Sequence, residues 1–172
     1  MVLTLDGDYM AIEFKTRIRG IDIYIRDLAK LDTKTYNAAR DGTVLAAEHL
    51  LEKVKAKIGV YQSTGGPPGG YGRWPKLKYE TRLKKLRKYG VGDKPLLMTG
   101  DLRDSFSVVE GGKGRLSASV GSSSPYLIHH VYGAPGANVP MRDPIRVTAK
   151  EEMEACHKII EDEIMKEIDT WW

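Results

Sequence analysis

Hydrophobic and polar positions near the start of the chain alternate with a period of two. Between residues 9 and 25, apolar side chains are separated by charged ones, which predicts a strand with one buried face. Gly20 interrupts the alternation. The isoleucines that follow fit either a resumed strand or a short helix that continues to Lys30.

From Thr33 onward the period changes to that of a helix. Apolar residues recur every three or four positions up to Ile58, and Gly59 then stands where a helix C-terminal glycine belongs. Gly42 lies inside this helix, where glycine lowers helix stability by about 1 kcal/mol relative to alanine. A kink or a break in the helix at this position is the alternative to a continuous helix.

A stretch rich in glycine and proline follows the long helix. Residues 59–72 contain six glycines and two adjacent prolines, which predicts a loop. We expect a flexible loop or arm over residues 59–76 within a single domain that spans residues 1–172. A linker between two domains is the alternative, but the first 58 residues supply too few elements to close a core alone.

The second half of the chain mixes short elements of both kinds. A last long helix is expected to begin at a capping box formed by Thr148 and Glu151. Its apolar stripe is Met153, Cys156, Ile160, Ile164, Ile168 and Trp171. The elements expected before it are a basic helix over 77–88, a short helix over 100–104 capped by Thr99, strands over 105–109 and 116–120 around a glycine-rich turn, and a helix that has Ser124 as N-cap and Pro125 in its first turn and ends at Gly133.

This mixture lacks a regular alternation of strands and helices. It predicts an α+β fold, with a small, mainly antiparallel sheet packed against two long helices. The chain has 172 residues and 41% hydrophobic residues, enough for one domain with a real core. The lone Cys156 excludes an internal disulfide, and neither a secretory signal nor an apolar run of membrane-spanning length is visible. We therefore expect a soluble product made in a reducing cytoplasm.

Charge is distributed unevenly along the chain, whose net charge is +4. The expected last helix is mainly acidic, whereas eight basic residues precede it between positions 73 and 88. They are Arg73, Lys76, Lys78, Arg82, Lys84, Lys85, Arg87 and Lys88. This basic segment is interpreted in three ways: as a solvated face, as a surface that meets the acidic helix of a neighbouring subunit, or as the lining of a channel that passes DNA.

Candidate reactive groups are few. His129 and His130 are adjacent, so on a helix they point about 100° apart and rarely bind one metal ion together; one is expected to pack against the sheet and the other to face solvent. The glycines of residues 111–114 lack phosphate-loop spacing, and the serines of residues 122–124 lack a nucleophile elbow. Asp101 and Asp104 are assigned to capping and solvation. We expect no enzyme, no metal, no cofactor and no small-molecule substrate.

The order of several short motifs in the region 73–145 resembles the virion-morphogenesis proteins of tailed bacteriophages, which complete the tail and join it to the head. The pattern of that family runs Trp-x-x-Leu, then Thr-Gly-x-Leu-x-x-Ser, then Val-Gly followed by Pro-Tyr, a histidine and a glycine, and last Pro-x-Arg. The matching residues here are Trp74, Leu77, Thr99, Gly100, Leu102, Gly121, Pro125, Tyr126, His129, Gly133, Pro140 and Arg142. The chain departs from the pattern after Arg142, where Asp143-Pro144-Ile145 replaces Pro-aromatic.

The resemblance implies a structural protein of the virion, located at the head–tail junction. Several copies, six by analogy with the symmetry of the tail, would form a ring that contacts other neck and tail proteins and, non-specifically, DNA in the lumen. The resemblance implies a structural role for His129 or His130. A tail terminator or a head-completion stopper protein is the alternative at the same junction. A small basic DNA-binding protein is the alternative from another class.

Overall fold

The computed structural model describes residues 33–62, 73–112 and 115–169. The expected strand over residues 9–25, most of the glycine-rich loop, and Trp171 lie outside this part of the chain.

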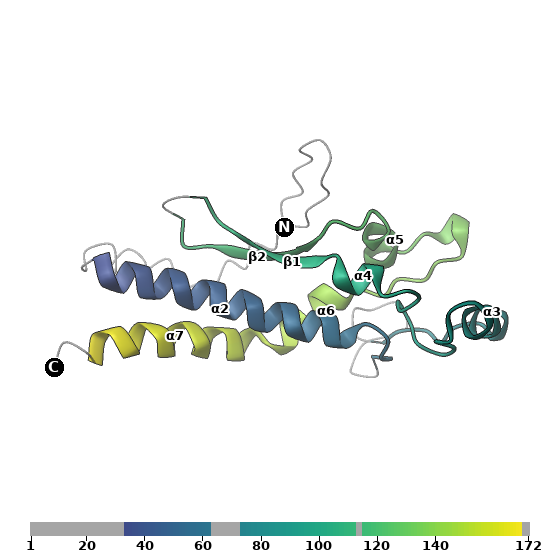
Figure 1. The fold of residues 1–172 in the computed structure, drawn as a ribbon, viewed down its shortest axis with the longest axis horizontal. Coiled ribbons are helices and arrows are strands. Elements are labelled where there is room, and N and C mark those ends of the chain that lie inside the picture. The colour runs from purple at the N-terminus through teal and green to yellow at the C-terminus, as the bar shows by residue number, and fades with distance from the viewer. Residues whose placement is uncertain (1–32, 63–72, 113–114, 170–172) are drawn as a thin grey trace.

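Two long helices run antiparallel along the molecule (Figure 1). They are α2 (Thr33–Lys57) and α7 (Met153–Asp169). The first remains helical through Gly42, so a break there is excluded. A Cβ atom at Gly42 would lie 3.1 Å from Cα of Ile160 and 3.2 Å from Cβ of Glu163. The glycine therefore lets α7 approach the backbone of α2 closely.

A β-hairpin covers α2 (Figure 1). Its strands, β1 (Phe106–Glu110) and β2 (Ala118–Ser122), are antiparallel and begin one and two residues later than expected. Phe106 pairs with Ser122, and Val108 pairs with Val120. The inner face of the hairpin shares a core with α2 and two later helices, consisting of Ala47, Val54, Ile58, Phe106, Val120, Leu127, Val131 and Ile145. The predicted α+β fold is confirmed.

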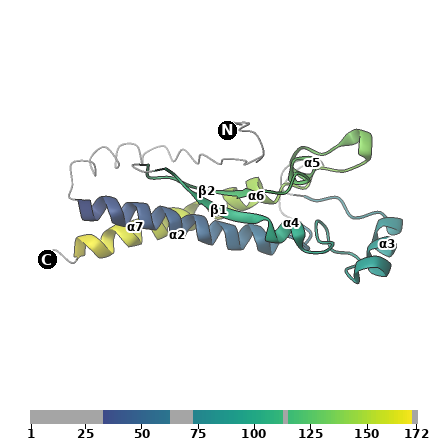
Figure 2. The same cartoon turned by 45° about the horizontal axis from the view of Figure 1, so that its top comes forward.

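Short helices complete the described part of the chain. They are α3 (Tyr79–Tyr89), α4 (Asp101–Asp104), α5 (Leu127–Tyr132), the 3-10 helix η1 (Pro135–Ala137) and α6 (Pro144–Glu151). In both ribbon views α3 stands at one end of the elongated molecule, opposite the end where α7 finishes (Figure 2). The hairpin and the helix pair lie between them.

The expected capping box at Thr148 is wrong. Thr148 lies inside α6, where its hydroxyl donates to the carbonyl oxygen of Pro144 at 2.6 Å. The helix begins instead after Asp143, whose Oδ1 accepts from the backbone N–H groups of Ile145 at 2.9 Å and Arg146 at 3.1 Å. An aspartate at the N-cap followed by proline at the first helical position is a strong signal for a helix start, and it determines where α6 begins.

Two other expected caps also differ. Gly100, with φ of +108°, occupies the N-cap of α4, and the hydroxyl of Thr99 accepts only a long 3.4 Å contact from the N–H of Asp101. Helix α5 begins at Leu127 after an N-cap at Tyr126, so Ser124 does not cap it and Pro125 belongs to the preceding turn. The N–H of Ser124 instead donates to Oγ of Ser122 at 3.0 Å.

The stripe expected along the last helix is confirmed from Cys156 to Ile168. Cys156, Ile160, Ile164 and Ile168 are half-buried, whereas Met153 is 46% exposed. A separate turn at Glu152 divides α6 from α7, so Met153 is the first residue of a new helix rather than part of one continuous face.

Candidate functional surface and its anchoring

The basic segment forms α3, a helix whose start and end have different causes. At its end, Gly90 adopts a left-handed conformation with φ of +69°, and its N–H donates to the carbonyl of Leu86 at 3.0 Å. At its start, Lys78 has no side-chain oxygen to cap the first turn. The helix starts at Tyr79, two residues later than the periodicity predicts.

Asp93 ties the turn after α3 to the residues before it. Its carboxylate accepts a 2.6 Å hydrogen bond from the Tyr61 hydroxyl and lies 3.4 Å from Nη1 of Arg82. The Tyr61 oxygen in turn accepts from the N–H of Leu77 at 2.9 Å. The Tyr61 hydrogen bond, with a smaller effect of Arg82, lowers the pKa of Asp93. Burial, followed by the bond to Asp93, raises the pKa of Tyr61.

Lys85 does not belong to an exposed basic surface, contrary to expectation. It is 5% exposed, and its ammonium donates to the carbonyl oxygen of Lys94. Burial, together with the positive charge of Arg142, lowers the pKa of Lys85. The side of α3 that carries Lys85 faces the turn over residues 90–98, so this lysine anchors the helix instead of presenting charge to a partner.

Arg142 connects two segments that are far apart in the sequence. Its Nη2 and Nε donate to the carbonyl oxygen of Pro75 at 2.7 and 3.3 Å, and its backbone N–H donates to the carbonyl of His130 at 2.7 Å. The neighbouring Trp74 is 3% exposed, and its backbone N–H donates to the carbonyl oxygen of Gln62 at 3.1 Å. The segment expected as an arm over residues 59–76 is thus held at both of its described ends.

The two adjacent histidines have the different environments that were expected. His129 is exposed, whereas His130 is half-buried, and its Nδ1 has no hydrogen-bond partner among the described residues. Burial, with smaller effects of Arg142 and His129, lowers the pKa of His130 to about 4. Although the motif was matched to His129, the structure therefore gives the packing role to His130.

The other motif residues are divided between the framework and the surface. Gly133 has φ of +74°, and a Cβ there would lie 3.2 Å from the N atom of Met141. Gly100 and Gly121 are buried, whereas Thr99, Pro125 and Tyr126 are exposed. Intermediate exposure is found for Leu77, Leu102 and Pro140.

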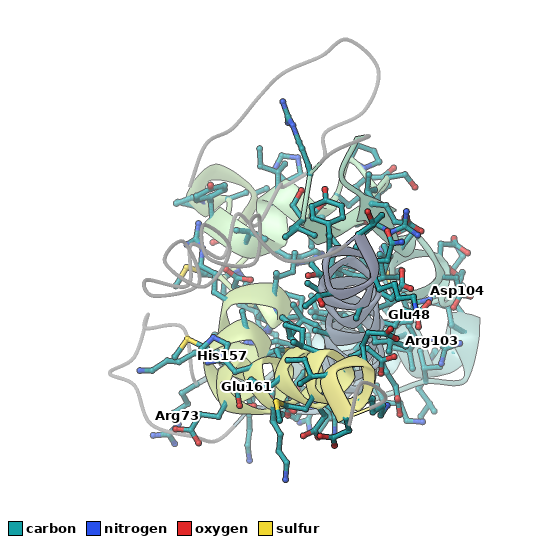
Figure 3. All side chains as sticks on the ribbon, turned by 90° about the vertical axis from the view of Figure 1, so that its left-hand side faces the viewer. Glu48, Arg73, Arg103, Asp104, His157 and Glu161 are labelled. Carbon is teal, nitrogen blue, oxygen red and sulfur yellow. The ribbon has the colours of Figure 1, made fainter. Side chains whose placement is uncertain are left out.

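The remaining basic residues do not all gather in one place. Figure 3 shows Arg73 on the side of the molecule that carries His157 of α7, away from α3. The exposed cations on α3 and its lead-in are Lys76, Lys78, Lys84, Arg87 and Lys88, called the α3 cationic surface below. An open depression of about 460 Å³ lies on this helix, lined by Glu80, Leu83, Lys84, Arg87 and Lys88.

Much of the acidic charge near the start of α7 is used within the molecule. Glu152 forms a 2.8 Å contact with Nε2 of His49, and Glu151 pairs with Lys57. Further along, Glu163 pairs with Lys166 at 2.7 Å. Figure 3, which looks along the helix pair, shows Glu161 of α7 and Glu48 of α2 on opposite sides.

Cys156 contacts the backbone of α2. Its sulfur lies 3.6 Å from the carbonyl oxygen of Ala46, and burial raises the pKa of the thiol. The described residues contain no group of three His, Cys, Asp or Glu side chains arranged to hold a metal ion. None of the described helices combines the length and apolar character needed to cross a bilayer.

Sequence reasoning missed the contacts that fix α3. Tyr61 and Asp93 belong to no sequence motif, and only the hydrogen bond between them in the structure shows that they hold α3 in place. Asp143 could have been found, because an aspartate directly before proline is a known helix start. Comparison of the chain with protein family models, curated proteins and solved structures found no match.

Proposed function

We propose that this chain is a structural subunit of a tailed bacteriophage, located at the head–tail junction, where several copies form a ring that completes the tail. The observation that carries the proposal is the link between Arg142 and Pro75. It joins the first and last blocks of the motif pattern, 67 positions apart, into one framework.

The motif residues support this role through what they do in the fold. Trp74 is buried, Arg142 holds a backbone carbonyl, and Gly133 permits close contact with the residues before α6. None of these three presents a reactive group in an open pocket. A pattern made of such residues specifies a shape, and the function of the molecule then depends on its exposed surfaces.

The exposed surfaces suit assembly. Large apolar side chains are exposed near the α3 end, and others are exposed along the helix pair, as expected for a subunit that buries them against neighbours. The former are Val60, Tyr79, Leu86 and Met98, and the latter are Leu45, Met153 and Met165. Because the two ends of the elongated molecule differ, a contact between them is heterologous, and such contacts close into rings when the rotation permits.

Sedimentation velocity and electron microscopy of the purified protein over a range of concentrations test the assembly. We expect a closed ring of fixed copy number, six by analogy with the tail. Exposed apolar side chains should drive the contact, so Tyr79→Ser with Leu86→Ser should shift the equilibrium towards monomer, while Val109→Ser on the exposed hairpin face serves as control. A protein that stays monomeric at all concentrations, both alone and with purified tails, would contradict the proposal.

Location in the virion separates a role on the tail from a role on the head. Antibodies against the chain, applied to virions of the phage that encodes it, should label the head–tail junction. Tails purified without heads should retain the label if the chain completes or terminates the tail. Label on heads alone would identify a stopper protein instead, and label on neither would refute the location.

A further inference from the structure

The α3 cationic surface carries charge that the rest of the described molecule does not neutralise. Lys84, Arg87 and Lys88 are spaced three and four positions apart, so they share one face of the helix. Within the described residues, none of the three forms an ion pair. On another side of the helix, Lys85 and Arg82 hold the turn that follows.

Nearby acidic groups are scarce or already engaged. Glu80 is the only carboxylate within α3. Asp93 accepts from Tyr61 and pairs with Arg82, so its charge is directed into the anchor of the helix. The exposed face therefore presents a row of cations, which attracts a ligand with regularly repeated negative charge.

The acidic helix of a second copy is a poor match for this row. Glu163 of α7 is already paired with Lys166, and Glu152, just before this helix, is paired with His49. The exposed positions of α7 also include Lys158 and Lys166, which interrupt its negative charge. A polyanion without interspersed cations satisfies the α3 surface better than α7 does.

The aromatic rings of α3 lie beside cations, and a duplex can bind this surface without using the rings. Proteins that bind single strands stack bases on exposed aromatic rings. Here the guanidinium of Arg82 lies 5.8 Å from the ring centre of Tyr79, and the ammonium of Lys88 lies 5.1 Å from that of Tyr89. A cation thus lies near each ring, although Tyr79 remains 66% exposed. Contact with the backbone of a duplex requires no stacking on either ring.

We propose that the α3 cationic surface binds the phosphodiester backbone of double-stranded DNA without sequence specificity. This inference does not depend on ring formation or on location in a virion. Lys84, Arg87 and Lys88 make phosphate contacts from the helix, and Lys76 and Lys78 extend the row along the lead-in.

Fluorescence anisotropy of the full chain with a labelled duplex of random sequence tests the proposal. Five phosphate contacts give a slope of log K against log salt of about −4.5, which corresponds to a loss of several hundred-fold between about 50 and 200 mM salt. The triple variant K84E/R87E/K88E should bind more weakly at low salt, and the magnitude of its slope should fall by about three. The matched control K34E/K150E/K158E changes net charge equally at exposed positions elsewhere and should retain most of the binding.

The same assay contains the outcomes that overturn the proposal. They are no binding at low salt, equal loss in the matched control, tighter binding to the single strand than to the duplex, and binding to poly-glutamate as tight as to DNA. The last result would assign the surface to an acidic protein partner. Circular dichroism of both variants establishes that they are folded, and alanine replacements at the same three positions should give a smaller loss in the same direction.

Discussion

Replacing Gly42 with alanine tests how closely the two long helices approach. In an exposed helix this change stabilises by about 0.8–1 kcal/mol, because alanine is the better helix former. At Gly42 the new methyl would meet Cα of Ile160 at 3.1 Å and Cβ of Glu163 at 3.2 Å. The first of these belongs to the α7 backbone, which cannot move aside as a flexible side chain does.

Whether Gly42→Ala stabilises or destabilises the protein depends on the gain in helix propensity and on the cost of the added methyl group. Inserting a methyl group into a packed interface costs about 1–3 kcal/mol, which exceeds the propensity gain in most of that range. We expect Gly42→Ala to lower the free energy of unfolding by about 1 kcal/mol. Gly42→Val should lower it further, because it adds two more methyl groups and a β-branched side chain to the same contact.

Urea unfolding followed by circular dichroism at fixed protein concentration measures the difference. Asn37→Ala, at an exposed position of the same helix, is the control and should stabilise by a few tenths of a kcal/mol or more. If Gly42→Ala stabilises the protein by the full propensity gain, the close approach of α7 is refuted.

Three further changes probe the framework around α3, α5 and α6. Arg142→Met removes the donors to Pro75 and should lower the free energy of unfolding by about 1.5–3 kcal/mol in urea, with Arg142→Lys closer to the wild type. The pKa of His130 is about 4 in the fold and near 6.5 when unfolded, so the unfolded state binds more protons between these values. Stability should therefore fall by up to about 3 kcal/mol as pH drops from 6.5 to 4, and His130→Gln should flatten that dependence. Asp143→Ala removes the cap of α6 and should cost about 1–2 kcal/mol by urea unfolding, whereas Asp143→Ser should recover part of the loss; equal stability of the two would argue against capping.

Local patterns in the sequence predicted the α+β fold and several of its elements. The helix from Thr33, the hairpin around its glycine-rich turn and the helix ending at Gly133 all follow from local rules that the tertiary structure does not override. Element boundaries were less predictable. The sequence contains two possible starts for the same helix, a capping box at Thr148 and the pair Asp143-Pro144. Both can satisfy backbone donors, but only one can begin the helix, and the helix begins after Asp143.

The anchoring of α3 could not be predicted, because it depends on pairs that no sequence rule connects. Lys85 fits the basic pattern as well as Lys84 does, yet the turn over residues 90–98 covers one and leaves the other exposed. Arg73 likewise belongs to the basic run but lies on a different side of the molecule (Figure 3). Local charge density in a sequence therefore overestimates the number of cations that a surface presents.

The framework that holds α3 also explains why this end of the molecule is so positive. Arg142 and Lys85 are both buried, and in the described structure each donates to a backbone carbonyl, of Pro75 and Lys94 respectively, rather than to a carboxylate. Their charges are therefore not cancelled by an ion pair. Burial, and to a smaller extent repulsion from Arg142, lowers the pKa of Lys85. Charge inside a low-dielectric region is less screened than charge in water, so it adds to the potential of the exposed cations nearby. Arg142→Met should consequently weaken the binding of a duplex without touching the proposed contact surface. Unchanged affinity in that variant, if it remains folded, would show that only the exposed row contributes.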